Sequence, residues 1–127
     1  MDYTYRKTIA LPFNDAVKKT KEALIAQGFG ILSETNVQET LKTKLSVDYP
    51  NYVILGVCNP ELSYKALQAE KEIGLFLPCK AIVYEEKGNV NVSVLLPGVI
   101  EKMIGNEKLK AVFSEAEEKL KNAIGTV

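Results

Sequence analysis

Two cysteines are the residues of this chain whose type and setting best suit chemistry. Cys58 ends an apolar run and is followed by Asn59-Pro60, whereas Cys79 follows Leu77-Pro78 and begins the next apolar run. If these runs are antiparallel neighbouring strands, both thiols lie at the same edge of a sheet. Asn59 would add backbone N–H groups at a helix start, which favour an anion or a thiolate. This edge is therefore our candidate ligand-binding site.

The same residues allow other interpretations. A low-pKa thiol at this edge could act as a nucleophile, as half of a redox pair or as a soft metal ligand, whereas a buried cysteine simply behaves as a small hydrophobe. The chain has no histidine and no CxxC spacing, so further metal ligands would have to come from Glu34, Glu70, Glu72 or a partner subunit. We therefore predict no metal site, and the sequence identifies neither a cofactor nor a catalytic residue. Glu34 and Glu70 stay as candidate ligand-binding residues, with exposed surface charge as the alternative.

Length and composition indicate one globular domain over residues 1–127, since 46% of the residues are hydrophobic and 25% are charged. Sixteen basic residues balance sixteen acidic ones, and Arg6 is the only arginine, so we do not expect a nucleic-acid partner. The N-terminus lacks the apolar core of a signal peptide, and no apolar run is long enough to span a bilayer. We therefore expect a cytoplasmic protein without membrane contact, whose cysteines are free thiols.

Period-two alternation over residues 3–11 predicts a half-buried strand. The apolar run 29–34 predicts a buried strand that becomes polar at its end, and the run 52–58, apolar on both faces, predicts a strand in the middle of the sheet. Residues 79–86 and 90–96 flank Lys87-Gly88-Asn89, which is typical of a β-hairpin. The segment 73–77 between the cysteines is predicted as an extended link.

Helical spacing begins at Phe13 and stops at Gly28, and shorter helices are expected over 37–45 and for about ten residues after Pro60. A short amphipathic piece covers 99–104. Asn106 is expected to cap the last helix, whose apolar stripe is the most regular in the chain. The order β-α-β-α-β-α-β-β-α, without a regular βαβ repeat, predicts an α+β fold with helices packed on a mixed or antiparallel sheet.

Glycine and tyrosine positions add two expectations. Gly56 lies inside a strand, which indicates close approach of a neighbouring chain segment, a bulge or room for a ligand. Six tyrosines are suited to the rim of a site or to a dimer surface, because tyrosine buries area while keeping a polar tip. They are Tyr3, Tyr5, Tyr49, Tyr52, Tyr64 and Tyr84.

Several motifs, taken in order and spacing, resemble the domain of unknown function 302 family. They are Gly28-Phe29-Gly30-Ile31-Leu32-Ser33-Glu34, Leu41-Lys42-Thr43-Lys44-Leu45, Tyr52-Val53-Ile54-Leu55-Gly56-Val57-Cys58-Asn59-Pro60, Ala66-Leu67-Gln68-Ala69-Glu70 and Ile73-Gly74-Leu75-Phe76-Leu77-Pro78-Cys79. The resemblance implies a small bacterial or archaeal cytosolic α+β domain, related in fold to the TATA-box-binding-protein-like group and forming homodimers. It implies no established activity. The DNA binding of that fold group is not carried over, because this chain lacks the basic surface for it.

Three functional hypotheses follow. The first is a homodimeric domain that binds a small ligand or a partner at the edge near Cys58, Asn59 and Cys79. The second is a thiol-dependent redox or metal-handling protein. The third is a structural module whose dimer surface is itself the function.

Overall fold

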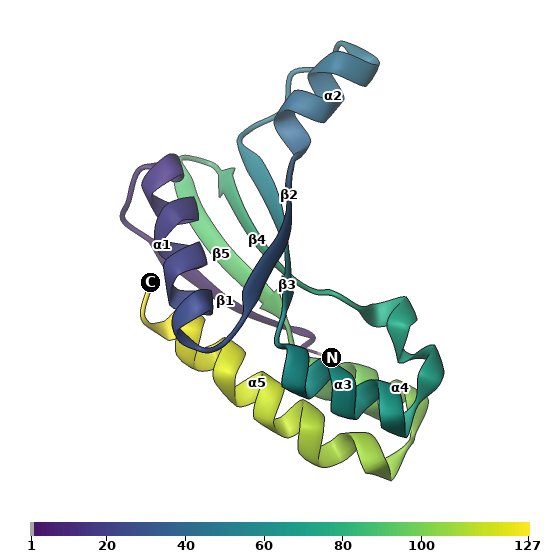
Figure 1. Cartoon of the computed structure of the whole chain (residues 1–127). Helices are drawn as coiled ribbons and strands as arrows, with labels where there is room; N and C mark the ends of the chain where they lie inside the picture. Colours follow the sequence, from purple (N-terminus) through teal and green to yellow (C-terminus); the bar gives the residue numbers. More distant parts are fainter. Residues whose placement is uncertain (1) are drawn as a thin grey trace.

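The computed structural model describes residues 2–127, and within them five strands form one sheet in the order β1-β5-β4-β3-β2. All four strand pairs are antiparallel, so the predicted α+β class is confirmed (Figure 1). The elements are β1 (Thr4–Ile9), α1 (Phe13–Ala26), β2 (Gly30–Asn36), α2 (Val37–Leu45), β3 (Tyr52–Cys58), α3 (Pro60–Ala69), the 3₁₀ helix η1 (Lys71–Phe76), β4 (Cys79–Glu86), β5 (Asn89–Leu95), α4 (Pro97–Ile104), the 3₁₀ helix η2 (Glu107–Leu109) and α5 (Lys110–Gly125).

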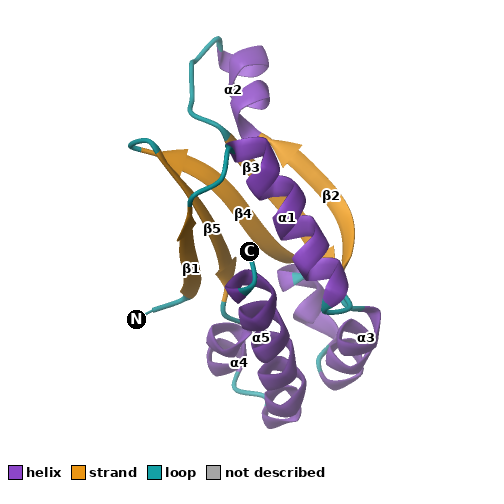
Figure 2. Ribbon diagram, turned by 90° about the vertical axis from the view of Figure 1, so that its left-hand side faces the viewer, coloured by secondary structure: helices purple, strands orange, loops and turns teal. Residues whose placement is uncertain are grey.

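Helices α1 and α5 cover one face of the sheet, and no helix of the described chain covers the other (Figure 2). The covered face carries buried residues of the three inner strands: Val53, Leu55 and Val57 of β3, Ala81 and Val83 of β4, and Val90, Val92 and Val94 of β5. Ile54 and Tyr52, on the opposite face, are only half-buried. The prediction that β3 is covered on both sides is therefore wrong. It is also not the middle strand, because β1 returns to pair with β5 and leaves β4 at the centre.

A second apolar cluster lies beyond the end of the sheet, where α3, η1 and α4 pack around the first half of α5. Its buried residues are Ala66, Ile73, Ile100, Leu109 and Phe113. The segment 73–77 is predicted as an extended link, but residues 71–76 form the 3₁₀ helix η1, which lets Ile73 turn fully into this cluster.

Edge strand β2 and helix α2 form an arm that projects from the body of the molecule (Figure 1). Six of the seven residues of β2 are exposed, so the prediction of a buried strand over 29–34 is wrong; Phe29, just before it, is the buried one. No residue of α2 is buried. The apolar residues of this segment suggest burial. The strand nevertheless lies at the edge of the sheet, with a neighbour on one side only, and so it stays exposed.

Helix caps and tight turns, which depend on residues close together in the chain, agree with the predictions. Asn36 Oδ1 accepts from the backbone N–H of Glu39 at 3.0 Å, which caps α2 as its spacing predicts. The hairpin turn between β4 and β5 places Lys87 and Gly88 at φ values of 51° and 82°, the left-handed backbone of a type I′ turn. Within residues 2–127, no helix combines the length and apolarity needed to cross a bilayer.

Gly56 of β3 is required by close packing against β2 and against Pro78, the residue before β4. A β-bulge in β2 falls between Ile31 and Ser33, and it brings Ser33 opposite Gly56. A Cβ atom on Gly56 would collide with Ser33 Oγ and would lie 3.2 Å from Pro78 Cγ. Of the three explanations that the sequence allows for this glycine, close approach is the one observed, with the bulge as its cause.

Gly56→Ala is therefore expected to lower the free energy of unfolding by about 1–2 kcal/mol, the usual cost of forcing an extra methyl group into a packed site. Chemical denaturation followed by circular dichroism measures this change. Ser33 is exposed, so Ser33→Ala alone should change stability by less than about 0.5 kcal/mol. The double variant should recover part of the loss, because Ser33→Ala removes the colliding hydroxyl. Strict additivity of the two changes would contradict the packing explanation.

Candidate functional site

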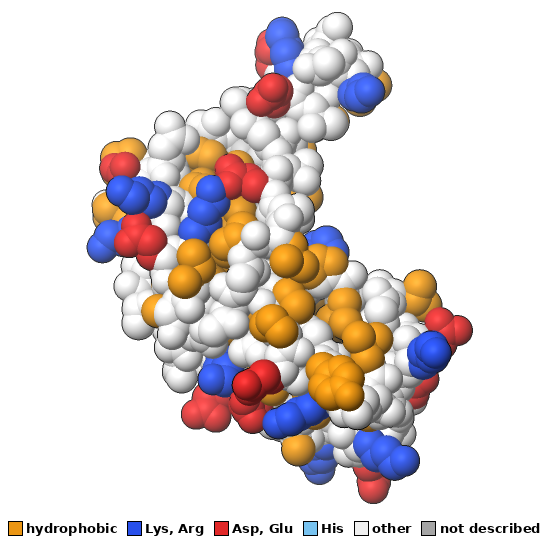
Figure 3. Space-filling view, in the orientation of Figure 1, with side chains coloured by type: hydrophobic (Ala, Val, Ile, Leu, Met, Phe, Trp, Pro, Cys, Tyr) orange, Lys and Arg blue, Asp and Glu red, His pale blue; other side chains and the backbone are white. Residues whose placement is uncertain are grey.

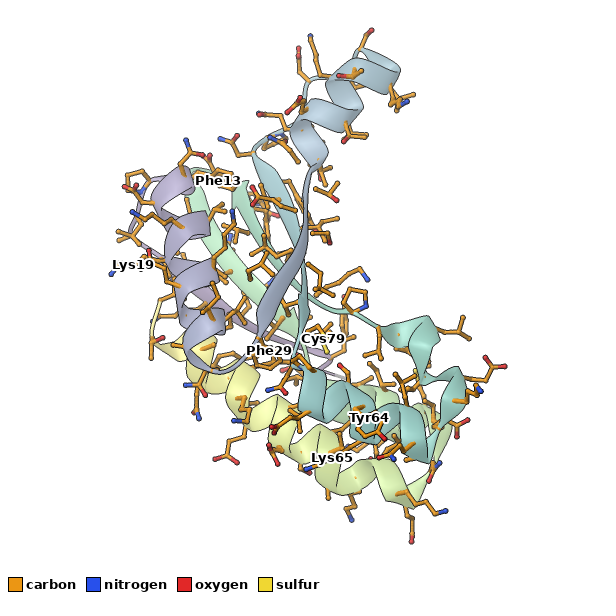
Figure 4. The ribbon with its side chains drawn as sticks, in the orientation of Figure 1. Phe13, Lys19, Phe29, Tyr64, Lys65 and Cys79 are labelled. Atoms are coloured by element: carbon orange, nitrogen blue, oxygen red, sulfur yellow. The ribbon has the colours of Figure 1, made fainter. Side chains whose placement is uncertain are left out.

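The register of β3 and β4 brings the two predicted cysteines to the same end of the sheet. Cys79 is the cross-strand partner of Val57, the residue before Cys58. Both cysteines are free thiols and both are half-buried. The antiparallel arrangement that the candidate site requires is therefore present, and Figure 4 shows Cys79 at this end of the sheet, above α3.

The two thiols have different surroundings. Cys58 Sγ lies 3.1 Å from Ser63 Oγ in the first turns of α3, a hydrogen-bond distance in which either atom can donate. Cys79 packs against the main apolar core, beside Phe29 (Figure 4). Burial raises the pKa of the Cys79 thiol, and the neighbouring Cys58 thiolate raises it further. Cys79 is therefore held in its neutral form, which is the less reactive one.

Asn59 uses its side chain to begin α3. Its Oδ1 accepts from the backbone N–H of Leu62 at 3.3 Å, and Pro60 occupies the first helical position, where no donor is needed. The side-chain amide also closes over Gly28, where an added Cβ would lie 3.1 Å from Asn59 Nδ2. The residue thus satisfies one of the N–H groups that were expected to face an anion.

Cys79 and Asn59 line a crevice between the sheet end, α3 and α5. Its cavity measures about 20 Å³, which leaves room for about one water molecule. No charged side chain lines this crevice, and most of its lining residues are apolar. They are Phe29, Asn59, Leu62, Ser63, Ala66, Leu77, Cys79, Val112, Phe113 and Ala116. The chemistry of this lining suits an apolar group rather than an ion.

Glu34 and Glu70, the other candidate residues, lie apart from the cysteines. Glu34 forms an ion pair with Lys21 of α1. Glu70, at the end of α3, accepts from Asn106 Nδ2 at 3.2 Å and so helps to hold the segment before α5. Neither carboxylate lines the crevice. Among residues 2–127, no group of three or more cysteine, aspartate or glutamate side chains gathers closely enough to hold a metal ion.

Two surfaces were not found by sequence reasoning. One is the uncovered arm, whose apolar spacing resembles that of any short core helix. The other is the helix-free face of the sheet, where Tyr52 and Tyr84 are cross-strand partners and their rings stack with centroids 5.5 Å apart. Tyr52 begins the run 52–58, whereas Tyr84 lies two residues before the end of the run 79–86, so their spacing in the sequence did not pair them.

The different surroundings of the thiols predict different labelling rates. With iodoacetamide near neutral pH, Cys79 should react more slowly than a small free thiol, because burial both shields it and raises its pKa. Its rate should continue to rise with pH beyond the range in which a free thiol levels off. Peptide mapping by mass spectrometry separates Cys79 from Cys58, and denaturant supplies the fully accessible control. Labelling of folded Cys79 at the free-thiol rate would contradict this assignment.

Comparison with known proteins agrees with the geometry. The crystal structure of an uncharacterized conserved DUF302 protein from Bacillus stearothermophilus is similar over 97% of this chain and 96% of that one, with a TM-score of 0.91 and 30% sequence identity. No curated protein matched the sequence. The family model described as domain of unknown function DUF302 matches residues 5–127. The chain therefore belongs to the DUF302 family.

Proposed function

We propose that the chain functions as a homodimeric binding domain whose two copies join through a notch on one side of the molecule. The notch is the concave region between α2, the edge strand β2 and the corner formed by α3 and η1 (Figures 1 and 3). The observation that carries the proposal is that α2 buries none of its residues within its own chain.

The arm is held by polar contacts rather than by a core. Besides the Asn36 cap, Gln38 Nε2 donates to the Tyr49 carbonyl at 3.0 Å, and Lys42 Nζ donates to Asp48 at 2.9 Å. A helix of nine residues is marginal in water on such contacts alone, because most helical stability in proteins comes from packing an apolar face. Leu45, in its last turn, is 65% exposed. A partner that covers this face would supply the missing burial.

The other walls of the notch are also apolar. Leu32 of β2 is 63% exposed, Tyr64 of α3 is 65% exposed and Leu75 of η1 is 81% exposed. Figure 3 shows apolar side chains gathered over this corner, below the notch. Contiguous exposed apolar surface of this kind marks interaction sites on proteins.

A second copy of the chain fits this surface by symmetry. A two-fold axis through the notch would place the arm of each copy against the α3–η1 corner of the other, so that both apolar surfaces are buried twice. Leu32 is the extra residue of the β2 bulge, and bulges discourage simple strand addition at a sheet edge. The contact is therefore expected to run through side chains of the notch.

Leu45→Asp should convert the dimer into a monomer, because the charge would have to be buried against the partner. Sedimentation velocity at micromolar concentration should show the mass falling to that of one chain, 14.0 kDa. The monomer should keep its circular dichroism spectrum, since Leu45 contributes nothing to the core. Met103→Asp is the matched control: Met103 of α4 is equally exposed, at 68%, but lies outside the notch. A wild-type protein that is monomeric in this experiment would disprove the dimer.

A second candidate function is the binding of a small apolar ligand in the crevice beside Cys58, Asn59 and Cys79. Its support is the apolar lining at the junction of the two clusters, where a modest separation of α3 from α5 would enlarge the cavity. The thiol-dependent alternative has less support, because burial raises the pKa of Cys79. Two free thiols fit the reducing cytoplasm that we propose as the site of action.

Native mass spectrometry of the purified protein tests this second candidate. A ligand in the crevice should appear as a small added mass, which should be lost from the Cys58→Ser, Cys79→Ser double variant because the replacement of Cys79 makes the lining more polar. The Leu45→Asp variant should keep that mass, which separates ligand binding from dimerisation. An added mass that survives in the double variant would place the ligand elsewhere.

A further inference from the structure

The helix-free face of the sheet carries a hollow of about 630 Å³ that takes no part in the notch or the crevice. Its lining includes Arg6 of β1, Ser93 of β5, Ile82 and Tyr84 of β4, and Tyr52 of β3. These residues come from four adjacent strands, where Arg6 pairs with Ser93 and Ser93 pairs with Ile82. A hollow of this size falls within the range of small-molecule sites.

Aromatic rings form one side of the hollow. The rings of Tyr52 and Tyr84 stack at 5.5 Å with an interplanar angle of 24°, and Tyr49 lies 6.3 Å from Tyr52 in a tilted arrangement. Flat ligands bind to such platforms because a planar ring gains stacking contact on a tyrosine face. All three tyrosines line the hollow.

The single arginine of the chain lies next to this platform. Arg6 Nη1 donates to Tyr84 Oη at 3.5 Å. This hydrogen bond is the main reason why the pKa of Arg6 is raised, and the charges of Tyr84, Glu86 and Asp2 add to it. Neither of those carboxylates forms an ion pair with Arg6 in the described part of the chain. The guanidinium group has five N–H donors, so donors are left for an incoming anion.

The Ser93 side chain forms part of the floor of the hollow. Ser93 is only 5% exposed, and no hydrogen bond joins its side chain to another residue between 2 and 127. Asn91, the next residue of β5 on the same face, accepts a hydrogen bond at Oδ1 from the Thr8 hydroxyl at 2.7 Å. Between residues 2 and 127, every fully buried side-chain N or O atom has a hydrogen-bond partner, so the Ser93 hydroxyl is accessible from the hollow. The Ser93 hydroxyl is therefore available for a hydrogen bond to a polar group of a molecule in the hollow.

We propose that this face binds a planar aromatic molecule that carries an anionic group. The ring stacks on the Tyr52–Tyr84 platform, the anionic group binds the Arg6 guanidinium and a polar atom of the ring edge meets the Ser93 hydroxyl. Aromatic carboxylates and mononucleotides share this chemistry. The inference does not depend on the notch dimer, because the hollow lies on a different surface of each chain.

Two-dimensional ¹H–¹⁵N NMR of the full chain tests the proposal with 4-hydroxybenzoate and adenosine 5′-monophosphate as probes. At least one of them should shift the amide signals of Arg6, Ile82 and Ser93 in a saturable way, and which one does so distinguishes the two sources. Arg6→Gln should weaken that binding about tenfold, the usual value of a charge-assisted hydrogen bond. Tyr84→Leu should weaken it as well.

Matched controls separate the ring from the charge. Adenosine and acetate, which each lack one of the two groups, should bind at least about tenfold more weakly than the active probe. Lys102→Gln changes a cation outside the hollow and should leave probe binding unchanged. The proposal is overturned if neither probe shifts these signals at millimolar concentration, if adenosine binds as well as its monophosphate, or if Arg6→Gln has no effect.

Discussion

The packing of α1 and α5 on a single face of the sheet is the constraint on which the rest of this structure depends. Leu24 of α1 and Leu120 and Ile124 of α5 are fully buried against alternate residues of the strands. Since side chains alternate along a strand, every residue that faces the helices leaves its two neighbours on the other side. One face of each strand therefore builds the core, and the other is left free for contact with other molecules.

The periodic and local parts of the fold could be predicted from sequence. Helices 37–45 and 60–69, the hairpin around Lys87 and Gly88, and the caps at Asn36 and Asn59 all depend on residues close in the chain. Exposure could not be predicted in the same way, because it depends on which strands become neighbours. The run 29–34 has an apolar composition, yet it forms an edge strand. Nothing in the residues of this run indicates that it lies at the edge of the sheet.

The candidate site shows the same division. The placement of Cys58 and Cys79 at the same end of the sheet was expected for antiparallel neighbouring strands, and the structure contains that pairing. Sequence could not show that the space beside them is only large enough for about one water molecule, because that space is set by α3 and α5 closing together. Nor could it show that Glu34 and Glu70 are engaged by Lys21 and Asn106, far along the chain from the thiols. Spacing identified a place in the fold, while packing decides its chemistry.

Helix α5 joins the two apolar clusters in one continuous element. Phe113 in its first half belongs to the cluster beyond the sheet, whereas Leu120, Ala123 and Ile124 in its second half belong to the main core. The first strand is tied to the same helix, since Lys7 Nζ donates to the carbonyls of Gly125 and Val127 at 2.9 and 2.8 Å. A helix shared in this way couples the opening of one cluster to the other. Because α5 follows every strand in the chain, a nascent chain on the ribosome keeps both apolar clusters incomplete until this helix emerges.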